Sequence, residues 1–366
     1  MIEPRAEAGT LERFCQAVLA AAGADGPSAE AAARAMMHAS IHGVDSHGVR
    51  LLPHYYKVLR GGRVKGAPAI TFNRTRVGSG LLDADHGHGA LAAYTAAGHA
   101  VDLAREAGIG AVGIRNSTHF GAAGAYTMAM AEAGMIGLAF CNSDSFVRLH
   151  DGASRFHGTN PISMAVPTGG RDPWLLDMAT SAVPYNRVQL YKSTGQSLPD
   201  HTASRGDGVD TADPGEVEML APLGAVVGFK GAGLAGMVEI FSALLTGMKI
   251  GPEILPMAGP DLATTREMGA FVICIDPAAF VGADLLRAGM DRYLSALRDS
   301  PARNGSRVMA PGDREWAEAH RRRSKGVPLD PETASEFTRL AQGAGIAVPF
   351  NETKRTKAQT KEGEKT

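Results

Sequence analysis

The chain contains 366 residues, of which 44% are hydrophobic and 20% are charged, and its formal net charge is −1. One hydrophobic core rarely organises so long a chain, so we expect two or three lobes. The near-neutral charge argues against a nucleic-acid or membrane partner, since either would favour a strongly basic surface or segment.

Residues 1–68 are predicted to form a small helical lobe. Apolar side chains recur at helical spacing in residues 11–19, and Ser28 can cap a second helix that continues to residue 41. A third helix is expected from about residue 46 to the glycines at 61–62.

From residue 69 onward, short apolar segments alternate with helical ones. We predict strands within 70–83 and at 110–115, 135–141, 162–166, 173–178 and 269–275, and helices at 89–107, 121–133, 232–247, 279–299 and 313–324. This alternation is typical of an α/β or mixed α+β sheet domain, which we place at residues 69–299.

Two segments lack this alternation. Residues 193–222 are rich in glycine, proline, aspartate and threonine, and we predict a loop that covers or lines a site. The lysine-rich residues 351–366 are predicted to be disordered.

The three cysteines, Cys15, Cys141 and Cys274, lie far apart among apolar neighbours. This spacing predicts buried, reduced thiols rather than a disulfide or a metal cluster. The first residues lack the basic-then-apolar pattern of a signal peptide, and no run of 18 apolar residues occurs. We therefore expect a cytoplasmic protein.

The segment from residue 42 to residue 62 holds the most suggestive chemistry. It brings His42, Asp45, Ser46, His47 and Arg50 within nine residues. An imidazole can donate a proton near neutral pH, and a guanidinium can grip a carboxylate through two parallel hydrogen bonds. The pattern therefore suits an enzyme that acts on a small acid, although a polar loop capping a helix would also account for it.

Three glycine-rich segments, which begin at Gly87, Gly108 and Gly231, match the dinucleotide fingerprint G-x-G-x-x-G/A. None of them has the full context of that fingerprint, which is a strand before, a helix after, and an acid ending the next strand. We therefore expect no Rossmann phosphate loop.

Metal-ligand spacings are also incomplete. His38 and His42 are four residues apart, but the glutamate of a HExxH zinc site is missing. Four potential ligands crowd residues 83–88 without a further anchored partner. We expect no bound metal, and keep as a remote alternative a metal-dependent hydrolase or lyase built on His42, Asp45, His47 and this cluster.

Five segments taken in order resemble the malate/L-lactate dehydrogenase family, which is unrelated to the Rossmann-type enzymes of similar name. They are DSHGVRLLPHYY (45–56), NSTHFGAAGAYTMAMAEAGMIGLAFCNS (116–143), GTNPISMAVP (158–167), LLDMATS (175–181) and PLGAVVGFKGAGLAGMVEIFSALLTG (222–247). The resemblance implies a non-Rossmann NAD(P)-binding sheet domain. It also implies a helical lobe in which residues 300–350 join residues 1–68, and usually a homodimer.

The reaction implied is hydride transfer between NAD(P)H and a small 2-oxo acid or 2-hydroxy acid. The alternative within the family is reduction of a cyclic imine acid, such as Δ1-piperideine-2-carboxylate or Δ1-pyrroline-2-carboxylate. In either case the resemblance makes His47 the proton donor, Ser46 its positioning or relay partner, and His119 a second histidine at the nicotinamide and substrate.

The resemblance also assigns binding roles. On the substrate side, Arg50 would clamp the carboxylate, assisted by Tyr55, Thr159, Asn160 and Arg187. The cofactor would contact His119, Phe120, Gly121, Ala122, Ser143, Asp177, Met178, Ala179, Lys230, Gly231 and Arg307.

Several of these residues could instead have a different role. Tyr55 could be a core aromatic residue, and Thr159 and Asn160 a simple turn. Arg187 could bind a second substrate acid group, bind the 2′-phosphate of NADP, or form a surface ion pair. The segment AVPYNRV (182–188) and the absence of tryptophan from residues 193–222 depart from the family pattern. The substrate and the choice between NAD and NADP therefore stay open.

Overall fold

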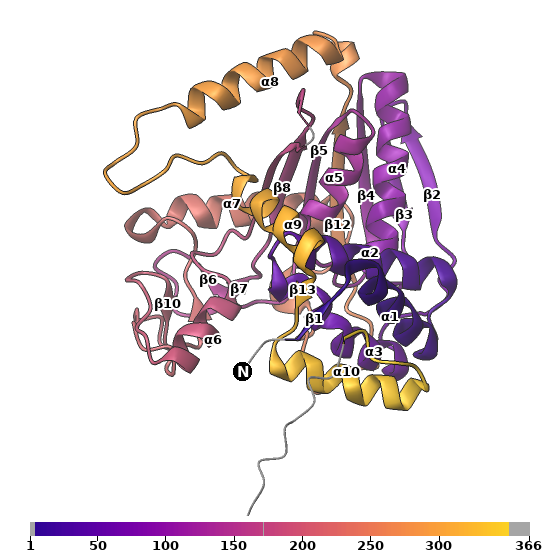
Figure 1. Cartoon of the computed structure of the whole chain (residues 1–366), viewed down its shortest axis with the longest axis vertical. Helices are drawn as coiled ribbons and strands as arrows, with labels where there is room; N and C mark the ends of the chain where they lie inside the picture. The colour runs from indigo at the N-terminus through magenta and orange to yellow at the C-terminus, as the bar shows by residue number, and fades with distance from the viewer. Residues whose placement is uncertain (1–3, 171, 351–366) are drawn as a thin grey trace, which may run out of the picture.

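The computed structural model describes residues 4–170 and 172–350, so the predicted disordered tail at 351–366 lies outside the described residues. Its largest feature is a seven-stranded sheet (Figure 1). In spatial order the strands are β2 (Thr71–Arg76), β3 (Ser79–Asp83), β4 (Ile109–Ser117), β12 (Met268–Ile275), β5 (Ile136–Cys141), β8 (Ile162–Val166) and β9 (Trp174–Met178). β3 and β4 run parallel, and all other neighbours in this sheet run antiparallel. The prediction of a mixed sheet is confirmed.

Helices α4 (Gly89–Ala107) and α5 (Gly124–Glu132) cover one face of this sheet. The buried side of α4 consists mostly of alanine, so its backbone lies close to the strands. A side chain at Gly110 of β4 would collide with the carbonyl oxygen of Ala100 in α4. Fully buried Val112, Ile114 and Val272 complete this core, and each such side chain contributes about 1.5–3 kcal/mol relative to exposure.

The opposite face of the sheet is covered by α7 (Phe229–Glu239) and by η4 (Ile240–Leu244), a π-helical continuation of the same helix. Phe241 stacks on Phe140 of β5 with ring centroids 5.1 Å apart. The predicted helix at 232–247 therefore starts earlier than expected and changes its winding at Ile240.

A second core lies in a helical cluster below the sheet (Figure 1). It joins α1 (Ala8–Ala21), α2 (Gly26–Ile41), α3 (Leu52–Gly61) and α10 (Pro331–Ala344), with the short pair β1 (Arg5–Ala6) and β13 (Val327–Pro328) beside them. Phe14 of α1 packs on Phe337 of α10 at 5.1 Å between ring centroids. Segments from the two ends of the chain thus share one apolar core.

Two details of the helical cluster differ from expectation. The cap of α2 is Asp25, whose carboxylate accepts from the backbone N–H of Ser28, so Ser28 is not the cap. Helix α10 was not predicted, although Asp330 at its N-cap and Pro331 at its first position are ordinary start signals.

Residues 193–222 are more ordered than the predicted loop. They contribute β10 (Ala203–Ser204) and β11 (Met219–Leu220) to a small sheet with β6 (Val147–Arg148) and β7 (Arg155–His157). Asp210 ties this segment down, because it accepts hydrogen bonds of 2.6 Å from both Arg148 and His201. Helix α6 (Tyr185–Thr194) precedes the segment.

The C-terminal third carries an extended arm (Figure 1). Helix α8 (Ala283–Arg298) stands away from the sheet, and the loop 299–312 leads back to α9 (Asp313–Lys325). Arg298 and Asp313 join the two ends of that loop through a 2.7 Å ion pair. Short 3₁₀ turns complete the chain at η1 (Asp45–His47), η2 (Val49–Leu51), η3 (Ala225–Val227), η5 (Gly251–Glu253) and η6 (Pro277–Ala279). No helix within the described ranges combines the length and apolar character needed to cross a membrane.

Candidate active site

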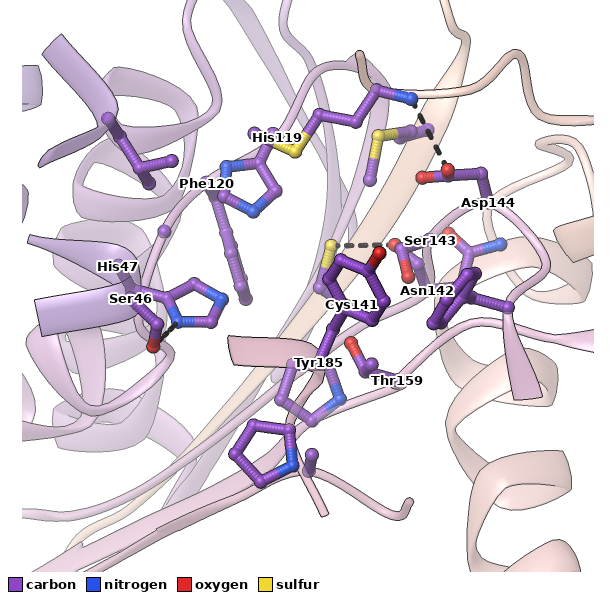
Figure 2. A pocket seen from close by; sticks show the side chains of 18 residues that line it. Ser46, His47, His119, Phe120, Cys141, Asn142, Ser143, Asp144, Thr159 and Tyr185 are labelled. Carbon is purple, nitrogen blue, oxygen red and sulfur yellow. Dashed lines mark hydrogen bonds between the residues drawn. The ribbon is translucent and has the colours of Figure 1, made fainter. Parts of the chain in front are cut away.

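A cavity of about 330 Å³ opens between the helical cluster and the large sheet (Figure 2). Residues from both sides line it, including Ser46, His47, Leu51, His119, Phe120, Gly121, Asn142, Ser143, Asp144, Phe146, Thr159, Ala179, Tyr185, Met257 and Met268. A second cavity of about 370 Å³ shares Ser46, His47 and Gly121 with it and extends to Asp177, Met178 and Ser181. The two cavities therefore adjoin each other, and together they could hold an extended ligand.

Two imidazoles, His47 and His119, face each other across this space. Their rings are stacked at 5.7 Å between centroids, with an angle of 20° between the planes. His47 closes the 3₁₀ turn η1, and His119 follows the end of β4. The fold therefore brings the two predicted histidines into one cavity, although 72 positions separate them.

Close backbone approaches hold each histidine in place. A side chain at Gly48 would collide with Ser40 of α2, whose hydroxyl accepts from the N–H of Val49 at 2.9 Å. A side chain at Gly89 would collide with the carbonyl oxygen of Thr118, next to His119. The glycines therefore let the two loops pack tightly enough to fix both rings.

Among the described residues, the side chain of each histidine has one hydrogen-bond partner. The Ser46 hydroxyl lies 2.8 Å from Nδ1 of His47, and the Tyr55 hydroxyl lies 2.9 Å from Nδ1 of His119. Burial lowers the pKa of His47, and burial together with the nearby positive charges of His47 and Arg266 lowers the pKa of His119 well below its usual value. Both rings are therefore neutral near pH 7, each with a second nitrogen available to a ligand.

Tyr55 does not line the cavity. It is buried behind His119, and its ring packs edge-on against His88 at 4.3 Å between centroids. The hydrogen bond to His119 makes it a support for that histidine, a role that is neither the expected pocket wall nor a purely apolar core position.

Arg50 is not at the cavity, contrary to expectation. Its side chain is 48% exposed and faces Asp330 and Glu332, at 3.9 and 3.6 Å. The cause is the 3₁₀ turn η2, in which successive side chains point about 120° apart. Leu51 therefore lines the cavity, while Arg50 lines a separate pocket on the outside of α3 with His54 and Lys57.

Of the other predicted substrate residues, Thr159 lies at the cavity, whereas the side chains of Asn160 and Arg187 do not line it. Thr159 lines both cavities, but the side-chain amide of buried Asn160 donates to Glu239 and to the carbonyl oxygen of Ala235, away from the cavity. Arg187 is exposed on α6, close in sequence to the lining residue Tyr185, and pairs with no acid among the described residues. The surface ion pair considered for Arg187 is therefore not formed within the described part of the chain.

Most of the predicted cofactor residues surround the adjoining cavities. Phe120, Gly121 and Ser143 line the first, and Gly121, Ala122, Asp177, Met178 and Ala179 line the second. Asp177 accepts a 2.9 Å hydrogen bond from the N–H of Gly124 at the start of α5, and burial raises its pKa to about 7. Its side chain nevertheless opens onto the cavity, within reach of a ligand.

Lys230, Gly231 and Arg307 do not line either cavity. Lys230 is exposed on the first turn of α7, and Gly231 is buried against the backbone of Leu223, itself a lining residue of the second cavity. Arg307 is exposed in the loop 299–312 of the arm. Whether these three residues reach the cavity depends on tertiary packing, which the local sequence does not encode.

Two features of the cavity fit a nicotinamide cofactor. Oδ1 of Asn142 is buried and has no hydrogen-bond partner among the described residues, while its amide group donates to Glu239 and Lys249. An unpartnered acceptor on a residue that lines the cavity suits a carboxamide N–H. Gly121 has a φ of +81° and carries no side chain, so its backbone is accessible to a ligand in both cavities, just before the start of α5.

Sequence reasoning missed several lining residues, namely Leu51, Asn142, Asp144, Phe146, Met257 and Met268. Asn142 and Asp144 flank the predicted Ser143 and could have been found by that neighbourhood. Nothing in the local sequence marks Met257 or Met268, which reach the cavity from a distant loop and strand.

The residues of the metal-dependent alternative are not assembled around His47. The ring of His42 packs on Trp316 at 4.8 Å, and Asp45 is paired with Arg322 at 2.9 Å. Among the residues that the structure describes, no three histidine, cysteine, aspartate or glutamate side chains form a group able to hold a metal ion.

Comparison with known proteins agrees with this geometry. Residues 6–338 match the malate/L-lactate dehydrogenase family. A malate dehydrogenase of Pyrococcus abyssi is 32% identical over 348 residues, which span 92% of this chain and 94% of the relative. The crystal structure of malate dehydrogenase from Entamoeba histolytica superimposes with a TM-score of 0.89 at 26% identity, covering 95% of this chain and 100% of the other. The Δ1-piperideine-2-carboxylate reductase of Pseudomonas syringae gives 0.81 at 27% identity, covering 92% and 99%. These matches confirm the resemblance of the five motifs, and the chain belongs to the malate/L-lactate dehydrogenase family.

Proposed function

We propose that the chain reduces a small 2-oxo acid to the 2-hydroxy acid, and catalyses the reverse oxidation, at the cavity between His47 and His119. The observation that carries this proposal is the pair of stacked imidazoles that line one cavity, 5.7 Å apart between ring centroids. When bound, NAD(P)H supplies the hydride for the carbonyl carbon. The protein must then orient the acid, exclude bulk water, and provide the proton that the oxygen takes up.

His47 is the proposed proton donor, and Ser46 positions its ring through the hydrogen bond to Nδ1. The pKa of His119 is lowered more than the pKa of His47, because the charges of His47 and Arg266 add to the effect of burial. His119 therefore stays neutral when His47 is protonated, and serves as a hydrogen-bonding group for the same oxygen. In the oxidation His47 takes the proton back.

The proposed cofactor contacts are the residues that line both cavities, led by Gly121, Ser143, Asp177 and Ala179. The backbone N–H groups at the start of α5 suit a phosphate group. NAD and NADP both fit these contacts, and their relative use is a matter for assay. Reduction of a cyclic imine acid is the second candidate, supported by the structural likeness to the Pseudomonas syringae reductase. In that reaction His47 would protonate nitrogen instead of oxygen.

The two apolar cores suggest that separate parts of the chain bind the cofactor and the substrate. We assign the sheet domain (69–299) to the cofactor and the helical cluster (1–68 with 300–350) to the substrate-side histidine. Three free, buried thiols suit a reducing compartment, so we place the enzyme in the cytoplasm.

A homodimer is supported by the exposed apolar side chains of α8 and of the α7 region. They are 37–73% exposed: Val226, Val227, Phe229, Leu234, Ile240, Leu244, Leu245, Phe280, Val281, Leu285 and Tyr293. Large exposed apolar patches are typical of protein–protein interaction sites, and each partner of a standard interface buries about 800 Å². We propose that a second copy of the chain covers these exposed side chains.

The test is an absorbance assay at 340 nm with NADH or NADPH and a panel of 2-oxo acids and cyclic imine acids. The variant His47→Asn should lower kcat by about 10²–10⁴-fold, because the proton donor is lost. Its cofactor affinity, followed by NAD(P)H fluorescence, should stay close to that of the unaltered protein. Substantial turnover in His47→Asn would remove His47 from the proposed role.

A further inference from the structure

The charge of the substrate cavity is unusual for an enzyme that binds acids. Among the described residues that line the first cavity, Asp144 is the one side chain with a full charge, and that charge is negative. No lysine or arginine lines this cavity within the described ranges. Much of the remaining lining is apolar, with Leu51, Phe146, Met257 and Met268.

Arg50, the arginine nearest in sequence to His47, does not bring its positive charge to the cavity. Arg50 lies on the outer side of α3, in the pocket of His54, Lys57 and Glu332. Leu51 holds the position on η2 that faces the cavity. The cation expected next to His47 is thus replaced by an isobutyl group.

Asp144 is held firmly in the cavity wall. One carboxylate oxygen is paired with Arg266, whose side chain Figure 2 does not show. The other accepts a hydrogen bond from the N–H of Met257 at 3.2 Å. The Arg266 side chain is only 2% exposed and also donates to the carbonyl oxygen of Leu255 at 2.8 Å, whereas the Asp144 side chain is 28% exposed. The acid therefore faces the cavity, and its compensating cation is enclosed behind it.

We propose that the substrate carries a single negative charge, the carboxylate next to the reacting carbon, and an uncharged side chain beyond that carbon. The hydroxyl of Thr159, which lines the cavity, is a neutral donor available for the one carboxylate. A second acid group would enter an apolar wall beside Asp144, with loss of hydration and like-charge repulsion. This inference rests on the proposed function, and it separates the chain from its malate-named relatives.

The test compares substrates of matched length that differ in one charge. The ratio of kcat/KM for 2-oxobutyrate over oxaloacetate, and for 2-oxovalerate over 2-oxoglutarate, should be at least tenfold in the full-length protein. The variant Leu51→Arg should shift that ratio toward the doubly charged acid by tenfold or more, since it places a cation at the cavity. Asp144→Asn should shift it in the same direction, provided that circular dichroism shows an unchanged fold.

Arg50→Ala is the matched control, one residue away from Leu51, and should leave the ratio within about twofold. Preference of the unaltered enzyme for oxaloacetate or 2-oxoglutarate would overturn this inference alone. A tenfold loss of kcat/KM for both acids in Arg50→Ala would also overturn it, because Arg50 would then be the carboxylate clamp. Failure to reduce any 2-oxo acid or imine acid, with NAD(P)H bound, would overturn the proposed function itself.

Discussion

The hydroxyl of Tyr55 offers a sharp test of how the site is built. It lies 2.9 Å from Nδ1 of His119, it is buried, and it does not touch the cavity. The variant Tyr55→Phe keeps the ring that packs on His88 and removes only this hydrogen bond. A buried polar group left unpaired costs about 1–3 kcal/mol.

If that cost falls on the orientation of His119 during reaction, kcat should drop by about 5- to 150-fold, since 1.4 kcal/mol is tenfold. If it falls on folding, the free energy of unfolding should drop by about 1–3 kcal/mol with kcat unchanged. We expect the first outcome, because the His119 ring faces the cavity and can turn without unfolding the chain.

The assay combines kcat at saturating cofactor and 2-oxo acid with urea unfolding and the ¹⁵N resonances of the His119 ring. Those resonances should change, because the phenol no longer selects which ring nitrogen carries the proton. Tyr94→Phe is the matched control: Tyr94 packs on Tyr126 in the sheet core, and its hydroxyl makes no hydrogen bond to a described residue. Unchanged kcat and unchanged His119 resonances in Tyr55→Phe would refute the reasoning.

Two further expectations concern Asp177 and the proposed dimer. Because burial raises the pKa of Asp177 from 3.8 to about 7, the folded chain binds a proton that the unfolded chain has lost, so this residue's contribution to stability falls as pH rises from about 4 to 7. Asp177→Asn should therefore gain stability relative to the unaltered protein over that range, and parallel curves of unfolding free energy against pH would contradict this. Leu244→Asp, at a side chain that is 63% exposed, should convert the proposed dimer to a monomer in sedimentation equilibrium with the fold retained. A chain that is already monomeric at micromolar concentration would contradict the proposed interface.

Much of the architecture followed from local sequence. Helix α4 was predicted with its observed bounds, since its alanine-rich segment is closed by Gly108. The strands of the large sheet were found because short β-branched and apolar segments repeat between helices. Helix α10 was missed although its local start signals are present, whereas the strands β10 and β11 were missed because their stability comes from packing partners that lie far away in the sequence.

The sequence by itself also determined the reaction class, through five motifs whose order and spacing mark the family, and it singled out His47 and His119. Only the tertiary structure decided which side chains reach the cavity. A 3₁₀ turn points Leu51 inward and Arg50 outward, and an ion pair joins Asp144 to Arg266 across 122 positions of the chain. One-residue changes in direction and long-range charge pairing leave no periodic signal in a sequence, because both depend on how distant segments pack in three dimensions.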